Sequence, residues 1–322
     1  MNETATDPVT MRAVVATEWG GPEVLTETRI TRPVPGPTEI LVRVHAAGLN
    51  PVDWKSRASG GFGMWGETPV LGYDVSGVVE AVGLGVTLFA PGDEVFGMPQ
   101  FPQQAGGYAE YVTGPARHFA RKPASLTHVE AAALPLAGLT AWQSLVDTAG
   151  VRAGQRVLVH AAAGGVGHLA VQIAKARGAY VLGTAGPAKQ DFLRGLGVDE
   201  PIDYTTTDFA RTVRDVDIVL DAYGADDYGT RSLAVLREGG TLVTLPSPDA
   251  VPAPEDTAAK SVRTGFTLVE PDYAGLLGLA ELVETGRLRP EVETVFPLAE
   301  AARAHTLGES GRTRGKIVLA VV

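Results

Sequence analysis

A single stretch, residues 156–178, limits the possible folds of this chain more than any other. It begins with the apolar run 157–159, which is typical of a strand buried on both faces of a parallel sheet. Gly165, Gly167 and Ala170 follow at the spacing G-x-G-x-x-A, and a helical pattern continues to the end of the stretch. A strand, a glycine turn and a helix in this order predict a dinucleotide-binding unit. The alternative is a buried strand-to-helix connection that binds no ligand.

The residue types of this turn suit the chemistry of a pyrophosphate. Gly165 and Gly167 allow a tight turn and a close approach of the backbone, and the small Ala170 allows the helix to pack against the strand. The first N–H groups of the helix have no partner within it, and together with the helix dipole they would hold the phosphate charge. We therefore expect Gly164, Gly165, Val166 and Gly167 to bind the cofactor.

Composition narrows the class of protein. The 322 residues suffice for two domains, and 45% hydrophobic with 20% charged residues is an ordinary balance for a globular protein. The net charge of -10, without any basic run, argues against a nucleic-acid partner and favours a small-molecule substrate. The chain has no cysteine, which excludes disulfides and thiolate metal sites, and its opening MNETATDP lacks the basic and apolar regions of a signal peptide. We expect a cytoplasmic protein that does not enter a membrane.

The first part of the sequence is rich in predicted strands. They cover residues 11–18, 39–47, 77–82, 93–97 and 108–112. The segment 48–57, GLNPVDWKSR, carries an Asn-Pro turn signal and places Asn50, Asp53 and Lys55 close together near a strand end. Polar side chains gathered there could line a pocket.

Helices begin to alternate with strands from Thr127 onward. Thr127 is a possible N-cap with Glu130 three residues later, and Pro135 breaks the helical pattern that follows. Beyond the glycine turn, the predicted strands are 180–183, 218–220, 241–245, 266–269, 292–296 and 316–322, with helices at 273–285 and 298–307. Apolar runs separated by helix-length segments are typical of a parallel sheet, and right-handed crossovers would make this sheet doubly wound.

Motifs spread along nearly the whole chain resemble the medium-chain dehydrogenase/reductases, and within them the zinc-independent quinone and enone oxidoreductases. They are GLNPVD at Gly48, LGYDVSGVVEAVG at Leu71, PGDEVFG at Pro91, GGYAEYV at Gly106, LPLAGLTAW at Leu134, AAAGGVG at Ala161, LREGGTLV at Leu236 and GKIVL at Gly315. The resemblance implies an α/β protein with a GroES-like β-rich substrate domain, residues 1–128 and 271–322. It also implies a Rossmann domain with a doubly wound parallel sheet, residues 129–270, an active site in the cleft between the domains, and a homodimer.

The same resemblance predicts that no metal is bound. Zinc-dependent members carry a cysteine where this chain has Asn50, a histidine where it has Tyr73, and a lobe with four cysteines. The six histidines, at positions 45, 118, 128, 160, 168 and 305, show no spacing such as H-E-x-x-H, so we interpret them as ordinary core or surface residues.

The end of the strand predicted at 180–183 favours NADPH over NADH. An NAD site normally has an acidic residue about 20 residues beyond the first glycine, but here residues 182–185 are Leu, Gly, Thr and Ala. Lys189 follows and could neutralise part of a 2′-phosphate charge, or it could be a solvated residue at a helix start. In similar reductases a lysine near this place and a tyrosine placed like Tyr204 contact the phosphate. We therefore assign Thr184, Lys189 and Tyr204 to the NADPH site.

A nicotinamide cofactor donates a hydride, and the protein aims it and stabilises the charge that develops on the acceptor. Without a metal as Lewis acid an isolated ketone is difficult to polarise. Hydride addition to an enone or a quinone instead gives an enolate or hydroquinone oxygen that one cation or donor can hold. The run NPVDWK resembles enone reductases in which a lysine faces that oxygen, which makes Lys55 the candidate. The alternative for this segment is a turn with a surface lysine.

Three neighbouring polar residues complete the predicted catalytic set. The resemblance places Asn50 near the nicotinamide or the substrate carbonyl, and Asp53 would orient Lys55 or cap the turn. Tyr73 could supply the proton that completes the reduction, as could Lys55 or water. It could equally be a packing residue whose hydroxyl finds a backbone partner.

Two other functions stay open. The segment TAGPAKQDFLRGLG at Thr184, with HAAAGGVG, also resembles the enoyl reductase domains of polyketide synthases. It would fit a stand-alone enoyl-thioester reductase, in which Lys189 could take a catalytic part. The third function is an NADPH-binding structural protein or redox sensor without turnover, although Lys55 and Asn50 beside an intact nucleotide turn disfavour it. Turnover of enones, turnover of thioesters, or NADPH binding without turnover would distinguish the three.

Overall fold

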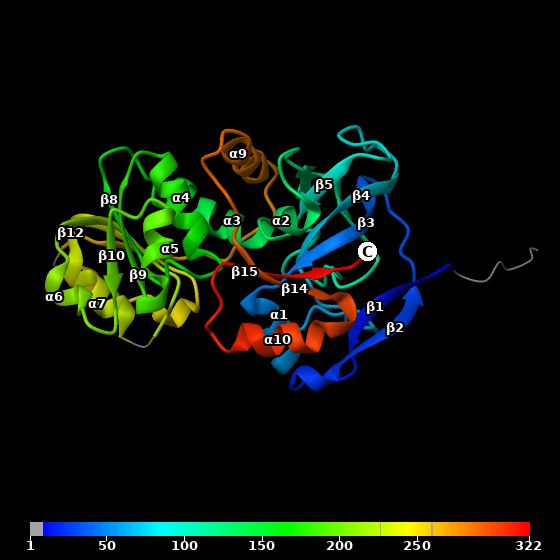
Figure 1. The fold of residues 1–322 in the computed structure, drawn as a ribbon, viewed down its shortest axis with the longest axis horizontal. Coiled ribbons are helices and arrows are strands. Elements are labelled where there is room, and N and C mark those ends of the chain that lie inside the picture. Colours follow the sequence, from blue (N-terminus) through cyan, green and yellow to red (C-terminus); the bar gives the residue numbers. More distant parts are fainter. Residues whose placement is uncertain (1–8, 226, 259) are drawn as a thin grey trace, which may run out of the picture. The chain divides into compact units, whose positions relative to one another are not determined.

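The computed structural model describes residues 9–225, 227–258 and 260–322, and the chain divides into two compact units (Figure 1). Unit 1 contains Met1–Leu136, Pro271–Leu276 and Val292–Val322, and unit 2 contains Ala137–Glu270 and Leu277–Glu291. The opening segment MNETATDP, residues 1–8, lies outside the described residues. Each unit has a sheet and an apolar core of its own.

Unit 1 is organised around a seven-stranded sheet in the order β14-β15-β3-β4-β5-β7, with β6 paired to β3. The strands are β3 (Glu39–Gly48), β4 (Asp74–Val82), β5 (Glu94–Gly97), β6 (Tyr111–Pro115), β7 (Phe119–Arg121), β14 (Val292–Pro297) and β15 (Lys316–Ala320). Ile40, Val42 and Val44 of β3 alternate into the buried core. A separate antiparallel pair, β1 (Thr10–Ala16) and β2 (Leu25–Thr31), adds Met11 and Ala13 to the same core.

A helix forms in unit 1 where the Asn-Pro signal predicts a turn. Helix α1 (Pro51–Ser59) has Pro51 at its first position and Asn50 as its N-cap, and Gly60 with a φ of 80° ends it. Proline suits a helix start because its missing N–H would have no partner there, and its fixed φ is already helical. The turn signal was therefore the beginning of a helix, on which Asp53 and Lys55 lie. Helix α10 (Ala301–Glu309) contacts α1 in the same unit.

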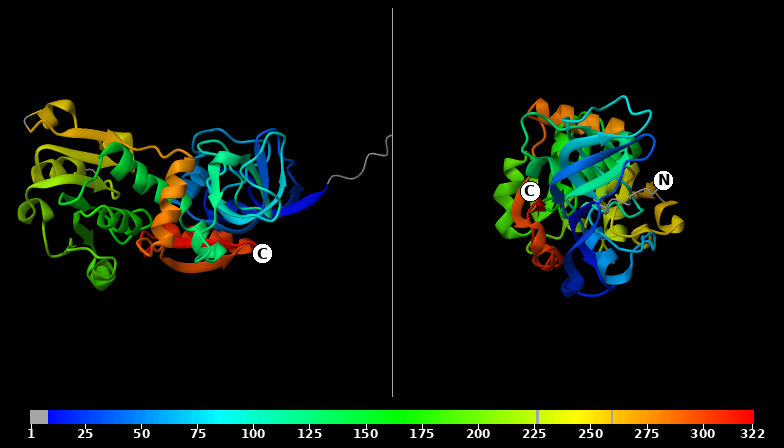
Figure 2. Two further views of the ribbon diagram at one scale, coloured as in Figure 1. Left: turned by 90° about the horizontal axis from the view of Figure 1, so that it is seen from above. Right: turned by 90° about the vertical axis from the view of Figure 1, so that its right-hand side faces the viewer.

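Unit 2 contains a six-stranded sheet in the order β10-β9-β8-β11-β12-β13, and all neighbouring strands are parallel. The strands are β8 (Arg156–Val159), β9 (Tyr180–Ala185), β10 (Glu200–Asp203), β11 (Val216–Asp221), β12 (Leu236–Thr244) and β13 (Arg263–Phe266). The helices between them are α4 (Gly167–Ala176), α5 (Gln190–Gly195), α6 (Phe209–Thr212), α7 (Tyr228–Val235) and α8 (Pro254–Ala258) (Figure 2). Because parallel crossovers are right-handed, the reversal of strand order at β8 puts α4 and α5 on one face and α7 on the other. The predicted doubly wound sheet is confirmed, and ligands bind such sheets at the reversal point.

Two segments join a different unit from the one that the sequence predicts. The predicted Rossmann domain starts at residue 129, but helix α2 (His128–Ala132) packs in unit 1, where Ala132 shares a buried cluster with Ala46 and Val318. Helices α3 (Pro135–Trp142) and α9 (Tyr273–Glu284) both cross from one unit into the other. Residues 277–291 belong to unit 2, because Leu279 of α9 lies against Gly138 of α3.

Short polar strands are where the predicted elements differ most from the observed ones. Strand β2 is almost entirely exposed and has the sequence LTETRIT, so it lacks an apolar run. Strand β10 contains Pro201, which is tolerated because β10 is at the edge of its sheet. The strand predicted at 266–269 lies three residues earlier, as β13.

None of the helices in the described ranges combines the length and the apolar character needed to span a bilayer.

Candidate functional site

The glycine turn lies between β8 and α4, at the carboxyl end of a central strand of unit 2. Its shape requires glycine at one position in particular. A Cβ atom on Gly167 would lie 2.2 Å from the carbonyl oxygen of Ala161 and 2.7 Å from the Cα of Ala162. Ala161 has a φ of 50°, a left-handed value that residues with a side chain rarely adopt. The backbone therefore doubles back on itself before the helix begins.

The same turn offers backbone donors to an anion. Among the described residues, the N–H groups of Gly165 and Val166 have no hydrogen-bond acceptor, while that of Gly164 donates to the Ala161 carbonyl. Gly164, Gly165 and Val166 are all partly exposed. Free N–H groups at the start of a helix, where the dipole is positive, form a ready anion site. The turn residues predicted to bind the cofactor lie together, and their backbone suits a pyrophosphate.

His160, directly before the turn, ties it to two neighbouring elements. Its Nδ1 lies 3.2 Å from Thr184 Oγ1 in β9, and its Nε2 lies 3.1 Å from Ser232 Oγ in α7. The Thr184 hydroxyl also accepts the N–H of Ala161. Burial, with the nearby charge of Arg231, lowers the pKa of His160 to about 3, so the ring stays neutral. The buried Thr184 side chain thus supports the turn, and His160 is a structural partner that sequence reasoning did not single out.

The residues predicted to bind the 2′-phosphate gather where β9 ends. A Cβ atom on Gly186 would lie 3.4 Å from the hydroxyl of Tyr204, so this exposed tyrosine lies beside the glycine. Lys189 ends the short 3-10 turn Pro187–Lys189, directly before α5. Gly186 and Lys189 thus follow the end of β9 along the chain, and Tyr204 lies beside Gly186.

One acidic residue near the end of β9 was not expected from the sequence. Asp203 of β10 pairs with Ala185 in the parallel register. Its Oδ1 accepts the backbone N–H and the hydroxyl of Thr205, at 2.9 and 2.7 Å. This carboxylate oxygen is therefore committed to its own loop.

In unit 1, a capping box at the start of α1 joins two of the predicted catalytic residues. The Asn50 N–H donates to Asp53 Oδ2 at 2.7 Å, and the Gly72 N–H donates to Asp53 Oδ1 at 3.1 Å. Asp53 is fully buried, and burial raises its pKa to about 7. The two backbone hydrogen bonds lower this pKa, while the nearby charge of Asp74 raises it further. Asp53 caps the helix.

The side chain of Asn50 is bound at both ends. Its Nδ2 donates to Asp74 Oδ2 at 2.9 Å, and its Oδ1 accepts from Lys316 Nζ. Lys316 Nζ also donates to the Leu49 carbonyl at 2.6 Å and lies 3.3 Å from Asp74 Oδ2. Burial raises the pKa of Asp74, and the charge of Lys316 opposes that rise. Sequence reasoning missed Lys316, whose only signal is the motif GKIVL.

Lys55 lies on the other side of α1 from Asp53. Residues two positions apart in a helix are separated by about 200° around its axis. In agreement with this, Asp53 is buried while Lys55 is exposed. In the described part of the chain, the Lys55 ammonium group makes no hydrogen bond or ion pair. The structure therefore shows no contact by which Asp53 would orient Lys55.

Tyr73 lies in the core of unit 1. It is 1% exposed, and its ring meets that of Phe101 edge-on with centroids 5.1 Å apart. The hydroxyls of Tyr73 and its neighbour Ser56 have no partner at ordinary hydrogen-bond geometry among the described residues. Burial, and then the charge of Asp53, raise the pKa of Tyr73, which opposes loss of its proton.

A second buried network joins α1 and α10. The Tyr108 hydroxyl lies 3.2 Å from His305 Nε2, and His305 Nδ1 lies 3.3 Å from Arg57 Nη1. Because a guanidinium group only donates, Nδ1 is the acceptor and Nε2 carries the proton. Arg57 also pairs with Glu309. Sequence reasoning could not find this network, because Tyr108 and His305 are 197 positions apart.

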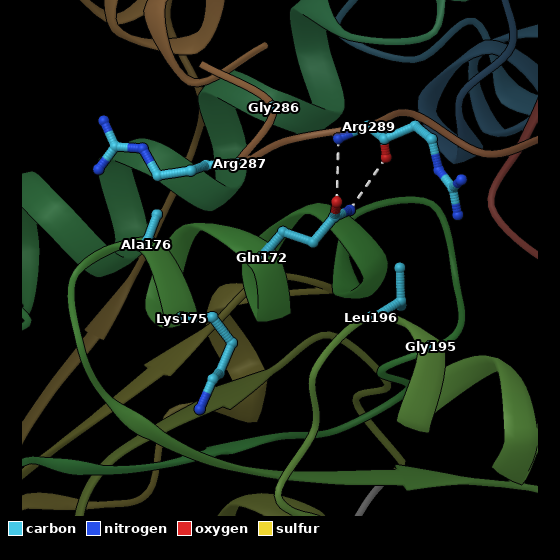
Figure 3. A pocket seen from close by; sticks show the side chains of 8 residues that line it. All are labelled: Gln172, Lys175, Ala176, Gly195, Leu196, Gly286, Arg287 and Arg289. Carbon is cyan, nitrogen blue, oxygen red and sulfur yellow. Dashed lines mark hydrogen bonds between the residues drawn. The ribbon is translucent and has the colours of Figure 1, made fainter.

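An open hollow of about 500 Å³ lies elsewhere on unit 2, beside α4 (Figure 3). The Gln172 side chain accepts the N–H of Arg289 and donates to its carbonyl, which ties α4 to the segment after α9. Arg287 and Lys175 also line the hollow, and Lys175 is paired with Asp199 at 2.7 Å. No residue of the predicted site belongs to it.

Within the described ranges, no three side chains of His, Asp or Glu are grouped so that they could hold a metal ion. Where the resemblance to zinc-dependent enzymes would place two metal ligands, Asn50 contacts an ammonium group and Tyr73 packs against Phe101.

Comparison with known proteins matches most of the chain. Residues 36–124 match the family described as alcohol dehydrogenase GroES-like domain, and residues 196–319 match the family described as zinc-binding dehydrogenase. The quinone oxidoreductase of Homo sapiens is 35% identical, over 98% of this chain and 99% of that protein.

Solved structures agree with these matches. A quinone oxidoreductase from Coxiella burnetii is 37% identical with a TM-score of 0.90, and the match covers 98% of this chain and 100% of that one. A mycobacterial protein complexed with NADPH is 32% identical with a TM-score of 0.85, and the match covers 97% of this chain and 100% of that one.

Proposed function

The chain belongs to the medium-chain dehydrogenase/reductase superfamily, in its quinone oxidoreductase type, and from this premise we propose that it uses NADPH to reduce a quinone or an enone without a metal. The predicted family and the predicted pairing of a GroES-like with a Rossmann domain are confirmed. That the protein is an oxidoreductase follows from its relatives. The choice of acceptor and the lack of a metal are the proposal.

One observation carries the proposal. The glycine turn presents the uncommitted N–H groups of Gly165 and Val166, and the strand beside it ends without a carboxylate. In our proposal the turn binds the pyrophosphate, while Lys189 and Tyr204 hold the 2′-phosphate that distinguishes NADPH from NADH. The NADPH-bound relative supports this choice of cofactor.

The acceptor would be reduced beside α1. NADPH, when bound, supplies a hydride, and the acceptor oxygen gains a negative charge and then takes a proton. Lys55 is exposed and carries an ammonium group that could stabilise this charge. The ammonium group of Lys316 beside Asn50 would repel a divalent cation, which supports reduction without a metal.

The location and the assembly extend the proposal. On the family resemblance we propose a homodimer in the cytoplasm. Size-exclusion chromatography with light scattering would determine the mass in solution, and a monomer at working concentration would contradict the assembly.

The first test follows NADPH oxidation at 340 nm with a short enone, a 1,4-quinone, an enoyl thioester and a saturated ketone. We expect turnover of the enone or the quinone. In Lys55→Ala the kcat should fall about 100-fold, the usual loss when one oxyanion partner is removed, while NADPH affinity is kept. Lys55→Arg should retain more activity than Lys55→Ala because it keeps the charge. Arg117→Ala removes another exposed cation of unit 1 and serves as the control.

The other outcomes point to different functions. Preference for the thioester would favour the enoyl-thioester reductase. Tight NADPH binding without turnover of any acceptor would favour a structural protein or sensor. Unchanged turnover in Lys55→Ala, or reduction of the saturated ketone alone, would exclude the proposed role of Lys55.

A further inference from the structure

Asn50, Asp74 and Lys316 form a buried ionic cluster at the start of α1. Their exposed fractions are 1%, 0% and 3%. Burying a charged pair generally does not stabilise a fold relative to apolar residues of similar size, because both ions lose their hydration. The surroundings are apolar, because Ala46 and Val318 belong to one buried cluster. Ala46 lies on β3, which ends two residues before Asn50, and Val318 lies on β15, which begins at Lys316. Stability alone therefore does not explain why these charges are buried here.

The hydrogen bonds of the cluster are almost completely committed. The three N–H bonds of the Lys316 ammonium group have three acceptors, namely the Leu49 carbonyl, Asn50 Oδ1 and Asp74 Oδ2. Asp74 Oδ2 also accepts from Asn50 Nδ2, and Asp74 Oδ1 accepts the N–H of Leu136 at 2.7 Å. The second N–H of the Asn50 amide is the one polar hydrogen of these three side chains that has no acceptor among the described residues.

These partners allow a single orientation of the Asn50 amide. Rotation by a half turn would set its Nδ2 against the Lys316 ammonium group and its Oδ1 against the Asp74 carboxylate, and both contacts would be repulsive. Asn50 is also the N-cap of α1, so its backbone is held by Asp53. The remaining N–H is thus a fixed donor at the positive end of the helix that carries Lys55.

We propose that Asp74 and Lys316 are positioning residues, which fix the Asn50 amide so that its remaining N–H meets the acceptor oxygen that becomes negative on hydride transfer. This inference rests on the proposed function. A donor that is already oriented needs no reorganisation when the charge develops, and for this reason such donors stabilise transition states effectively.

The test replaces both charges together, so that neither is left buried alone. In Asp74→Asn/Lys316→Met, the new amide oxygen at position 74 can still accept the hydrogen bond from the Leu136 N–H. The new NH₂ group then faces Asn50. The Asn50 amide should then rotate, so that its oxygen replaces its N–H at the acceptor. We expect the kcat for the quinone to fall at least tenfold, with the KM for NADPH unchanged and the melting temperature unchanged or raised. Lys316→Arg should keep most of the activity, because it restores the donors.

The matched control removes a similar lysine elsewhere in unit 1. The Lys122 side chain is 6% exposed, and its ammonium group donates to the carbonyls of Pro123 and Leu126 and pairs with Glu94. Glu94→Gln/Lys122→Met should leave the kcat unchanged. A fall in kcat equal to that of the first double variant would show a general loss of packing and would overturn the inference.

A second readout does not depend on turnover. The side-chain NH₂ signal of Asn50 can be identified in a ¹⁵N–¹H spectrum by its loss in Asn50→Ala. We expect slow solvent exchange of this NH₂ group in the wild type and a shifted, faster-exchanging signal in Asp74→Asn/Lys316→Met. An unchanged signal would overturn the positioning role. If the wild type turns over and Asn50→Ala turns over equally well, this inference is refuted but the proposed function is not. Absence of turnover in the wild type would refute the proposed function.

Discussion

Asp53 is a fully buried carboxylate of unit 1 that has hydrogen bonds but no ion pair with any of the described residues. Its two oxygens accept the N–H groups of Asn50 and Gly72. The buried lysine nearby, Lys316, pairs with Asp74 and not with Asp53. Desolvation therefore dominates and raises the Asp53 pKa to about 7. The two buried carboxylates thus differ in their surroundings, because Asp74 is paired with Lys316 whereas Asp53 is held by backbone N–H groups.

The raised pKa predicts a pH dependence of stability. The folded protein binds the Asp53 proton more tightly than the unfolded chain does, so the contribution of this group to stability is full below about pH 4. It is lost as pH rises toward 7, and the total over the three pKa units is at most on the order of 4 kcal/mol. The side chain of Asp53→Asn cannot ionise, but its amide has only one oxygen to accept the two backbone N–H groups that the two carboxylate oxygens accept in the wild type. We expect the variant to be less stable than wild type at pH 5, with a smaller difference at pH 8.

Urea unfolding at pH 5, 6, 7 and 8 measures this effect. The control is Asp191→Asn, because the Asp191 side chain is 99% exposed and its replacement should shift the curve equally at each pH. Parallel curves for wild type and Asp53→Asn would show that Asp53 does not titrate in this range.

At the scale of single elements, the glycine turn and α4 depend on one close contact. In a helix, glycine to alanine normally stabilises by up to about 1 kcal/mol, because alanine restricts the unfolded chain. At Gly167 the added Cβ would meet backbone atoms of Ala161 and Ala162 at less than 3 Å, and backbone cannot easily move away. The general propensity and the local geometry therefore predict opposite signs.

We expect Gly167→Ala to destabilise the protein by about 1–3 kcal/mol, the usual range for overpacking, and to weaken NADPH binding at least tenfold. Gly195→Ala is the matched control, because Gly195 also lies in a helix of unit 2 and nothing lies within 4 Å of its added Cβ. Denaturant unfolding and NADPH titration would measure both variants. If Gly167→Ala behaves like Gly195→Ala, the close approach of the turn is not required.

At the scale of the whole molecule, the two units carry different parts of the proposed site. Unit 2 contains the glycine turn together with Lys189 and Tyr204, whereas unit 1 contains Lys55 and the cluster around Asn50. In the proposed function the pyrophosphate and the 2′-phosphate are bound by unit 2. Binding energy from these groups should therefore stabilise unit 2 first.

Hydrogen exchange with and without NADPH tests this division. A ligand at 100 times its Kd stabilises by about 2.7 kcal/mol, which slows exchange about 100-fold where opening requires its release. We expect such slowing in β8 and α4, and much less in β1 and β2. NADH should slow exchange less than NADPH, and Lys189→Ala should reduce that difference. Equal slowing throughout the chain would show that the two units open together.

Much of the local structure at the predicted nucleotide site followed from the sequence. The strand, turn and helix are contiguous, so the residue types alone determine their order and their bends, and the glycine spacing identifies the turn. The capping box of Thr127 and Glu130 was predicted for the same reason, since both partners lie within one helical turn. The helix α1 was missed, because an Asn-Pro pair suits both a turn and a helix start.

Contacts between distant residues were decided only by the tertiary structure. Lys316 lies 266 positions from Asn50, and His160 lies 72 positions from Ser232. A pattern of residue types specifies local backbone conformation, because propensity and capping act within a few residues. Which buried side chain meets another depends on strand register and on how helices pack, and these are settled by the whole core at once. The sequence by itself thus determined the family, the doubly wound sheet and the glycine turn, and the folded chain decided the partners of Asn50, Asp53 and Tyr73.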